Sequence, residues 1–253
     1  MAGRDEIVSY CNELLDTGGF RDMLPLGLQV PGAGEVRLVV SGVTASLELF
    51  ERAADAGAQM VLVHHGMFVG SGLRPPIDAR EKARLKTLFD NDLSLVAYHL
   101  PLDAHPEVGN NALICGLLGI AHPEAFAEHG GRPLGWIGSV DPPISLEELV
   151  GRVQQQINPE PLVFDDGPAR VSRVAVVSGS AAGDVVPAAD AGADCFVTGE
   201  LKEQVMSEAR EAGISVIGAG HYRTEVFGVQ ALGERLAERF GVEHRFVDIP
   251  NPV

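Results

Sequence analysis

Several histidine and carboxylate residues in this sequence have the types and spacing of a metal site. Two histidines are adjacent at the end of the apolar run VLV, and the stretches HLPLD and HYRTE each place a carboxylate four residues after a histidine. Histidine and carboxylate together are the ligand set of Zn, Mn, Fe, Ni or Co. A pair of such ions activates water for hydrolysis. The predicted ligands of two divalent ions are His64, His65, Asp103, His221 and Glu225.

The adjacent histidines raise a question of direction. Neighbouring side chains on an extended segment point to opposite sides. His64 and His65 therefore suit two different ions, unless the strand has already turned where they lie. A carboxylate can bridge two ions through its two oxygens, and Glu225 or Asp103 can fill that role.

The elements that must position these residues are strands alternating with helices. The strands are apolar along their whole length, which is typical of an α/β fold with a largely parallel sheet buried on both faces. In such folds ligands bind beyond the carboxyl ends of the strands. We expect His99, His221 and Glu200 to be the last residues of their strands, and therefore to lie at this edge of a sheet. Glu200 has a second interpretation, as a charge complement to the first turn of the next helix. The expected strands that carry these residues cover 37–43, 59–65, 93–99, 173–179, 194–200 and 214–221.

Two parts of the chain repeat one another, which predicts two similar lobes. Residues 38–66 and 174–200 both read as strand, Ser-Gly, a helix ending in AADAGA, and a second strand. A further strand with a histidine follows each copy. We expect one α/β lobe over residues 1–125 and another over 126–253, related by a pseudo-two-fold axis with the metal site in the cleft between them. The alternative is coincidence, because AADAGA is a common helix end. Periodicity weakens from Pro123 to Pro133, before a short predicted strand.

Composition limits the possible partners. The chain has 253 residues, 45% of them hydrophobic and 21% charged, which suits a globular protein with a core of normal size. Its formal net charge of −16 argues against nucleic acids and anionic membranes as partners. The three cysteines have no metal-binding or disulfide spacing, and the sequence lacks a signal peptide pattern or a membrane-length apolar run. We therefore expect a cytoplasmic protein.

Several motifs occur in order along nearly the whole chain: GLQV (27–30), SGVTAS (41–46), VHHG (63–66), HLPLDAHPEVGNN (99–111) and GAGHYRTE (218–225). Together they resemble the NIF-three-like family, whose members are also called GTP cyclohydrolase type 2 homologues or dinuclear metal centre proteins. The short bacterial form without an inserted central domain is most similar.

The resemblance implies a dinuclear site between two lobes and a toroidal homohexamer. It implies the same five ligands, with Glu225 bridging the two ions and His99 beside them. One departure is visible, because the Gly-Leu-Gln motif is often preceded by Asn and here the residue is Leu26. That departure puts in doubt a polar role for this loop position.

Three classes of function follow from these patterns. The first is a metal-dependent hydrolase or cyclohydrolase of a small, nucleotide-like substrate, in which His99 and Glu200 are the catalytic candidates that move protons. The alternative is a non-catalytic metal-binding or regulatory scaffold that forms a ring-shaped hexamer. A third, weaker possibility is a ring that acts on DNA ends, against which the acidity of the chain argues.

Overall fold

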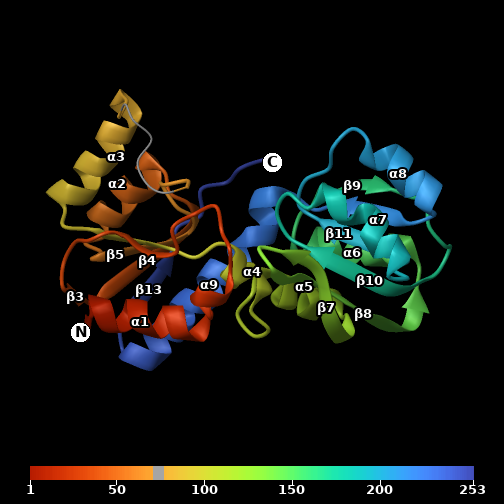
Figure 1. Ribbon diagram of the computed structural model, residues 1–253, viewed down its shortest axis with the longest axis horizontal. Coiled ribbons are helices and arrows are strands. Elements are labelled where there is room, and N and C mark those ends of the chain that lie inside the picture. The colour runs from red at the N-terminus through yellow and green to blue at the C-terminus, as the bar shows by residue number, and fades with distance from the viewer. Residues whose placement is uncertain (71–76) are drawn as a thin grey trace. The chain divides into compact units, whose positions relative to one another are not determined.

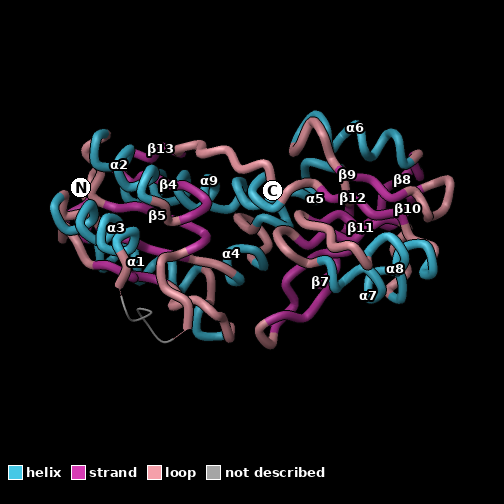
Figure 2. Tube along the Cα trace, turned by 90° about the horizontal axis from the view of Figure 1, so that it is seen from above, coloured by secondary structure: helices cyan, strands magenta, loops and turns pink. Residues whose placement is uncertain are grey.

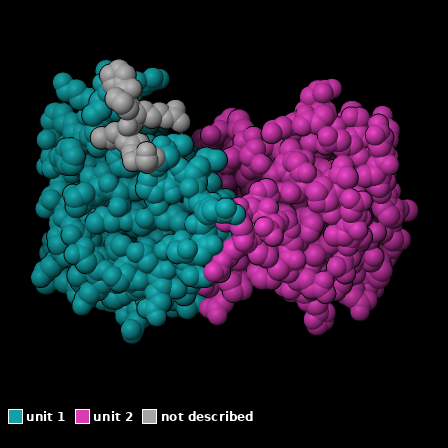
Figure 3. All heavy atoms as spheres, in the orientation of Figure 1, with its two compact units in different colours: residues 1–102, 228–249 teal, residues 103–227, 250–253 magenta. Residues whose placement is uncertain are grey.

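The apolar runs of the sequence form the strands of two large sheets, one in each of two units (Figures 1 and 3). A further two-stranded sheet in unit 1 pairs Ala2–Gly3 with Glu35–Val36. The computed structural model describes residues 1–70 and 77–253. Unit 1 consists of residues 1–102 and 228–249, and unit 2 of residues 103–227 and 250–253. The units are discontinuous in sequence because the later part of the long helix α9 (His221–Phe240) and the strand after it belong with the amino-terminal segment.

The main sheet of unit 1 runs in the order β13-β4-β5-β6-β2. The first four strands are parallel, and β2 pairs with β6 in the antiparallel direction. Helices α2 and α3 lie on one side of this sheet, and α1 and α9 on the other (Figure 1). The elements of unit 1 are β1 (Ala2–Gly3), α1 (Arg4–Leu14), a short 3-10 helix (Thr17–Gly19), β2 (Gly27–Val30), β3 (Glu35–Val36), β4 (Leu38–Thr44), α2 (Leu47–Asp55), β5 (Met60–His65), α3 (Ala79–Asp90), β6 (Ser94–Ala97) and β13 (Glu243–Phe246), with part of α9 (His221–Phe240).

The sheet of unit 2 runs in the order β7-β8-β10-β11-β12-β9. Strands β10, β11 and β12 are parallel, whereas β7, β8 and β9 each pair in the antiparallel direction. Apolar residues of α5 and α6 pack against the strands in one continuous core. The elements are α5 (Asn110–Leu118), β7 (Ala121–His129), β8 (Arg132–Ile144), α6 (Leu146–Gln156), β9 (Leu162–Phe164), β10 (Val171–Val177), a 3-10 turn (Ala182–Asp184), α7 (Val185–Asp190), β11 (Cys195–Thr198), α8 (Val205–Ala212) and β12 (Ser215–Gly218), with α4 (Leu100–Ala104) at the boundary.

The repeat seen in the sequence reappears in the strand order. Three parallel strands followed by an antiparallel edge strand form β4-β5-β6-β2 in unit 1 and β10-β11-β12-β9 in unit 2. The helices that connect the parallel strands, α2 and α3 or α7 and α8, also correspond. The predicted mixture of strands and helices in an α/β fold is therefore confirmed, and both sheets include antiparallel strands.

One β-hairpin was not predicted from the sequence. Strands β7 and β8 span the stretch from Pro123 to Pro133, where periodicity is weak, and β8 extends well beyond the short strand that was expected there. Strand β7 lies at the edge of the sheet and most of its residues are exposed. Because neither of its faces is fully buried, its sequence carries little of the apolar alternation that reveals a strand.

The predicted ends of three strands that carry candidate residues were wrong. Strand β6 ends at Ala97, β11 at Thr198 and β12 at Gly218. His99, Glu200 and His221 therefore lie beyond the strands and not at their ends. His221 is the first residue of α9, and Gly220 before it has a φ of +90°, which favours glycine at this turn. Each histidine therefore sits where the chain leaves the sheet and turns into a helix.

No helix in the parts of the chain that the structure describes combines the length and the apolar character needed to span a membrane.

The tube view of Figure 2, turned by 90° from Figure 1, shows the same alternation of helices and strands along each unit.

The close approach of α9 to the ring of His244 makes a prediction about stability. A Cβ atom on Gly233 would lie 2.2 Å from Nε2 of His244, whose ring is held by a 2.8 Å hydrogen bond to Ser41. Gly233→Ala should therefore destabilise the protein by about 1–3 kcal/mol in urea denaturation, because the ring has to move.

The matched control is Gly151→Ala in α6, where a Cβ atom would meet nothing within 4 Å. That change should stabilise the protein by up to about 1 kcal/mol, the usual gain of alanine over glycine in a helix. Equal stabilisation by both substitutions would contradict the packing described for α9.

Candidate metal centre

Three histidines of unit 1 converge at the carboxyl end of β5. The ring centroids of His64 and His65 are 4.9 Å apart, and that of His99 is 5.0 Å from the first and 5.7 Å from the second. One ring nitrogen of each lies within 4.8 Å of those of the others. The adjacent histidines therefore do not diverge as they would in the middle of a strand, since β5 ends at His65.

Hydrogen bonds fix the orientation of the first two rings. Nδ1 of His64 lies 2.9 Å from the carbonyl oxygen of Tyr98, and Nδ1 of His65 lies 3.0 Å from Oγ1 of Thr44. Because a carbonyl oxygen only accepts, Nδ1 of His64 carries the proton. The lone pair of the neutral ring is then on Nε2, which is the usual arrangement of a metal-binding histidine.

A buried carboxylate fixes the third ring. Oδ1 of Asp22 accepts hydrogen bonds from Nδ1 of His99 (2.9 Å) and the backbone N–H of Leu24 (3.0 Å), and Oδ2 accepts from the N–H of Leu100 (3.0 Å). Burial by itself would raise the pKa of Asp22, but the hydrogen bond and charge of His99, with the two N–H groups, hold it below its ordinary value. Asp22 is therefore ionised and holds the proton of His99 on Nδ1.

The Gly-Leu-Gln segment braces the loop that follows the paired histidines. Oε1 of Gln29 accepts from the N–H of Met67 (2.9 Å), and Nε2 donates to the carbonyl oxygen of Pro25 (2.8 Å). A Cβ atom on Gly66 would lie 2.3 Å from the Gln29 amide, so only glycine allows this approach. The GLQV and VHHG motifs thus meet in one local structure.

Unit 2 supplies two buried carboxylates. Oδ1 of Asp103 accepts hydrogen bonds from Nδ2 of Asn110 (2.8 Å) and Oγ of Ser178 (2.9 Å). An oxygen of Asp103 and one of Glu225 lie within 4.8 Å of each other. Both carboxylates are almost completely buried, with exposed fractions of 4% and 2% for the residues. Two buried carboxylates this close together favour a cation.

His221 lies between two carboxylates. Its Nδ1 is 2.5 Å from Oε1 of Glu200, and its Nε2 is 3.1 Å from Oε1 of Glu225. Burial alone would lower the pKa of His221, but the hydrogen bonds and charges of Glu225 and Glu200 raise it to about 9. Without a metal ion, His221 is therefore a cation, and a metal ion would replace the proton on Nε2.

A glycine makes room for this arrangement. Gly179 has a φ of +65°, and a Cβ atom there would lie 2.4 Å from Oε1 of Glu225. Its N–H donates to Oγ1 of Thr224 (3.0 Å), and its carbonyl oxygen accepts from the N–H of Glu200 (2.9 Å). The Ser-Gly loop after β10 thus positions both carboxylates, one on α9 and one on the loop after β11.

Each unit therefore brings its own predicted site residues together. His64, His65 and His99 cluster in unit 1, and Glu200 lies beside the predicted ligands of unit 2. The groups that orient these side chains were not predicted from the sequence. Asp22 had no signal in its glycine- and proline-rich stretch, whereas the asparagine pair of the VGNN motif was visible but had no assigned role. The groups that were missed are Asp22, Asn110, Ser178 and Gln29.

The surroundings of His221 make a prediction for the metal-free protein. Because its pKa of about 9 lies above the ordinary value of 6.5, the charged ring stabilises the fold fully below pH 6.5. That contribution is lost as the pH rises through about 9. An NMR titration in the presence of a chelator should give a midpoint near 9, and Glu200→Gln should lower it.

Glu211→Gln, on the exposed side of α8, is the control and should leave the midpoint unchanged. A midpoint at or below 6.5 in the unmodified protein would show that the two carboxylates do not hold this ring.

Comparison with known proteins matches residues 2–252 to the family model described as Duf34/NIF3 (NGG1p interacting factor 3). A Pseudomonas aeruginosa protein named GTP cyclohydrolase 1 type 2 homolog is 44% identical over 246 residues, 97% of either chain. An Escherichia coli K12 protein of the same name is 42% identical over 248 residues, 98% of either chain.

Two solved structures are similar over their whole length. The protein ybgI, described as of unknown function, has a TM-score of 0.93 at 41% identity and covers 100% of both chains. A protein from Thermus thermophilus has a TM-score of 0.89 at 39% identity, again over 100% of both chains. The sequence match over almost every residue and the shared fold lead to one conclusion: this chain belongs to the Duf34/NIF3 family.

Proposed function

We propose that this protein binds two divalent metal ions and uses them to hydrolyse a small, nucleotide-like substrate. The observation that carries the proposal is the way in which the histidines are held. Each has a hydrogen-bond partner of its own unit at Nδ1, which leaves Nε2 as the coordinating atom. The proposed metal ligands are His64, His65, Asp103, His221 and Glu225.

The donor set fits divalent metals of the transition series. Imidazole and carboxylate groups suit Zn, Mn, Fe, Ni and Co, and the carboxylates of unit 2 would neutralise much of the ionic charge. Glu225, whose Oε1 already lies 3.1 Å from Nε2 of His221, is the proposed bridging ligand. Bound ions would supply an acidified water molecule and polarise the substrate.

His99 and Glu200 are the proposed proton-handling groups. With Nδ1 of His99 on the ionised Asp22, its Nε2 can accept a proton from a nucleophile and return it to a leaving group. Glu200 would act mainly by positioning His221, because one of its oxygens is 2.5 Å from Nδ1 of that ring.

We further propose that the two sets of ligands form one centre in a cleft between two lobes related by a pseudo-two-fold axis. The repeated strand order of the two sheets supports two lobes of the same kind. By motif, the lobe over residues 1–125 would contribute VHHG and HLPLD, and the lobe over residues 126–253 would contribute TGE and GHYRTE. This division differs from that of the two units, which places Asp103 of HLPLD in unit 2.

The proposed substrate class is supported by the relatives, which are named GTP cyclohydrolase 1 type 2 homologs. The net charge of −16 disfavours nucleic acid, whereas bound cations would reverse the field locally for a small anionic substrate. We also propose that the protein forms a cytoplasmic homohexamer, as the family resemblance implies. Size-exclusion chromatography with light scattering tests this assembly by measuring its mass.

Metal analysis tests the proposal directly. Protein purified without added metal should hold two equivalents of divalent ions per chain, and the double variant His65→Ala/Glu225→Ala should lose most of this metal because both ligand sets are broken. The control His129→Ala, a residue that pairs with Asp184, should keep the full content. One equivalent or none in the unmodified protein would contradict the dinuclear site.

The hydrolytic part of the proposal has its own test. The metal-loaded protein should turn over at least one member of a nucleotide panel, and the double variant should not. Full metal content without turnover of any member would leave a metal-binding scaffold as the function.

A further inference from the structure

Two hydrogen bonds occupy one oxygen of the Asp103 carboxylate. Oδ1 accepts from Nδ2 of Asn110 at 2.8 Å and from Oγ of Ser178 at 2.9 Å. A carboxylate oxygen has two lone pairs, so these two donors use both acceptor positions of Oδ1. A cation that bound Oδ1 would have to break one of the two bonds. The donors therefore direct a cation to the other oxygen, Oδ2.

Asn111 holds the loop that carries Ser178. Its Oδ1 accepts from the backbone N–H of Ser178 (2.6 Å), and its Nδ2 donates to the carbonyl oxygen of Leu134 in β8 (2.9 Å). A carbonyl oxygen only accepts and an N–H only donates, so both bonds require the same orientation of the amide. Asn111 thus ties the start of the loop to β8, the strand that pairs with β10.

Thr224 holds the next residue of the same loop. Its Oγ1 accepts from the backbone N–H of Gly179 (3.0 Å). Two consecutive N–H groups of the loop are therefore held by two different helices, α5 through Asn111 and α9 through Thr224. Because its backbone is held in this way, Ser178 presents its hydroxyl to Asp103 from a defined direction.

The hydrogen-bond network around Asp103 is shielded from solvent. Asn110, Asn111 and Thr224 are completely buried, and Ser178 and Asp103 have exposed fractions of 6% and 4%. A polar group that loses a partner in such surroundings has little water to replace it, so these bonds are costly to break. The two donors should therefore stay on Oδ1 when an ion binds.

The number of oxygens that a carboxylate offers affects the choice of ion. Zn²⁺ in proteins is usually held by four ligands, and a single carboxylate oxygen fills one of the four positions. Mn²⁺ is suited to carboxylate and water ligands in an octahedral arrangement, in which a carboxylate that binds through both oxygens fills two positions. A carboxylate limited to one oxygen therefore favours Zn²⁺ relative to Mn²⁺.

We propose that Asn110 and Ser178 determine which metal the site prefers, because they restrict Asp103 to one coordinating oxygen. Oδ2 binds the ion, and Oδ1 keeps its two donors. The site then favours Zn²⁺ over Mn²⁺. The inference rests on the proposed function in one respect, because it takes Asp103 as a metal ligand. Asn110 and Ser178 are positioning residues, which act on the ion through Asp103.

Removal of the hydroxyl donor tests this inference. Ser178→Ala opens one acceptor position on Oδ1, so that Asp103 can bind an ion through both oxygens. One bound equivalent of Zn²⁺ should be held about tenfold more weakly, the usual cost of removing a partner of a metal ligand, whereas Mn²⁺ should lose less affinity. The ratio of Zn²⁺ to Mn²⁺ affinity should therefore fall. Competition with a chromophoric chelator, starting from metal-free protein, measures both affinities.

The matched control for this variant is Ser207→Ala on α8. Its hydroxyl donates to the carbonyl oxygen of Gln204 (2.9 Å) at an exposed position. Loss of this hydroxyl should leave both metal affinities unchanged.

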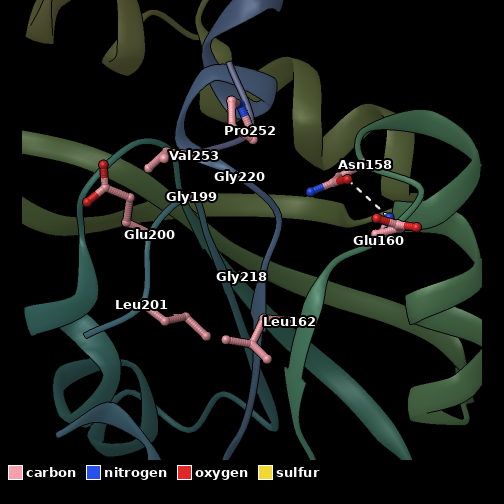
Figure 4. Close-up of a pocket in the computed structure, with 10 residues that line it drawn as sticks. All are labelled: Asn158, Glu160, Leu162, Gly199, Glu200, Leu201, Gly218, Gly220, Pro252 and Val253. Carbon is pink, nitrogen blue, oxygen red and sulfur yellow. Dashed lines mark hydrogen bonds between the residues drawn. The ribbon is translucent and has the colours of Figure 1, made fainter. Parts of the chain in front are cut away.

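Asn110→Ala removes the other donor and should lower the Zn²⁺ to Mn²⁺ ratio in the same direction. Its control is Asn158→Ala, which deletes an amide of the same size elsewhere in unit 2. Figure 4 shows Asn158 at the edge of a pocket of about 260 Å³, where its Oδ1 accepts from the N–H of Glu160 (3.1 Å). Asn158→Ala should leave the ratio unchanged.

The possible outcomes separate this inference from the proposed function. An unchanged ratio in both Ser178→Ala and Asn110→Ala would overturn the inference. Loss of Zn²⁺ and Mn²⁺ affinity in equal proportion would also overturn it, because that result indicates a general loosening of the fold. In both cases the unmodified protein would still bind its two ions, and the proposed metal centre would stand. An unmodified protein that binds neither metal would contradict the proposed function, and this inference with it.

Discussion

The hydrogen bond at Nδ1 of each candidate histidine is the interaction on which the site depends. A backbone carbonyl holds His64, a threonine hydroxyl holds His65, and carboxylates hold His99 and His221. An imidazole that is free to rotate or to change tautomer loses much of its value as a ligand, whereas one fixed at Nδ1 presents the lone pair of Nε2. The structure fixes the direction of these four rings before any ion is bound, and on His221 an ion would replace the proton on Nε2.

The sheets explain how such precision is reached with short side chains. Buried parallel strands are rigid, and the candidate histidines lie at the end of such a strand or a few residues beyond it. Glycines at the turns, such as Gly66 and Gly179, let other groups approach the backbone closely. The fold thus places polar groups beside a rigid apolar core, and the same arrangement occurs at the second sheet.

Much of this could be predicted from the sequence. The apolar runs predicted the strands that carry the site, and adjacency and spacing singled out the paired histidines and the carboxylates after His99 and His221. Asp22 could not be found in the same way, because it is 77 residues from its partner and sits in a loop of low periodicity. Contacts of this kind are set by tertiary structure and leave no local pattern.

Other features lay beyond the sequence for different physical reasons. The exposed edge strand β7 lacks a buried face, so its alternation is weak. The repeat gave no indication that β13, near the carboxyl end, pairs with β4 in unit 1, because strand pairing over such a distance depends on topology. Glu200 could be placed near the strand end, but not against Nδ1 of His221, which required the geometry of the first turn of α9.

Anomalous diffraction from crystals grown with a divalent transition metal tests the central claim most directly. Two anomalous peaks per chain, coordinated by Nε2 of His64, His65 and His221 and by the carboxylates of Asp103 and Glu225, are the predicted result. Ions bound elsewhere, or coordinated through the Nδ1 atoms that the structure assigns to hydrogen bonds, would contradict it.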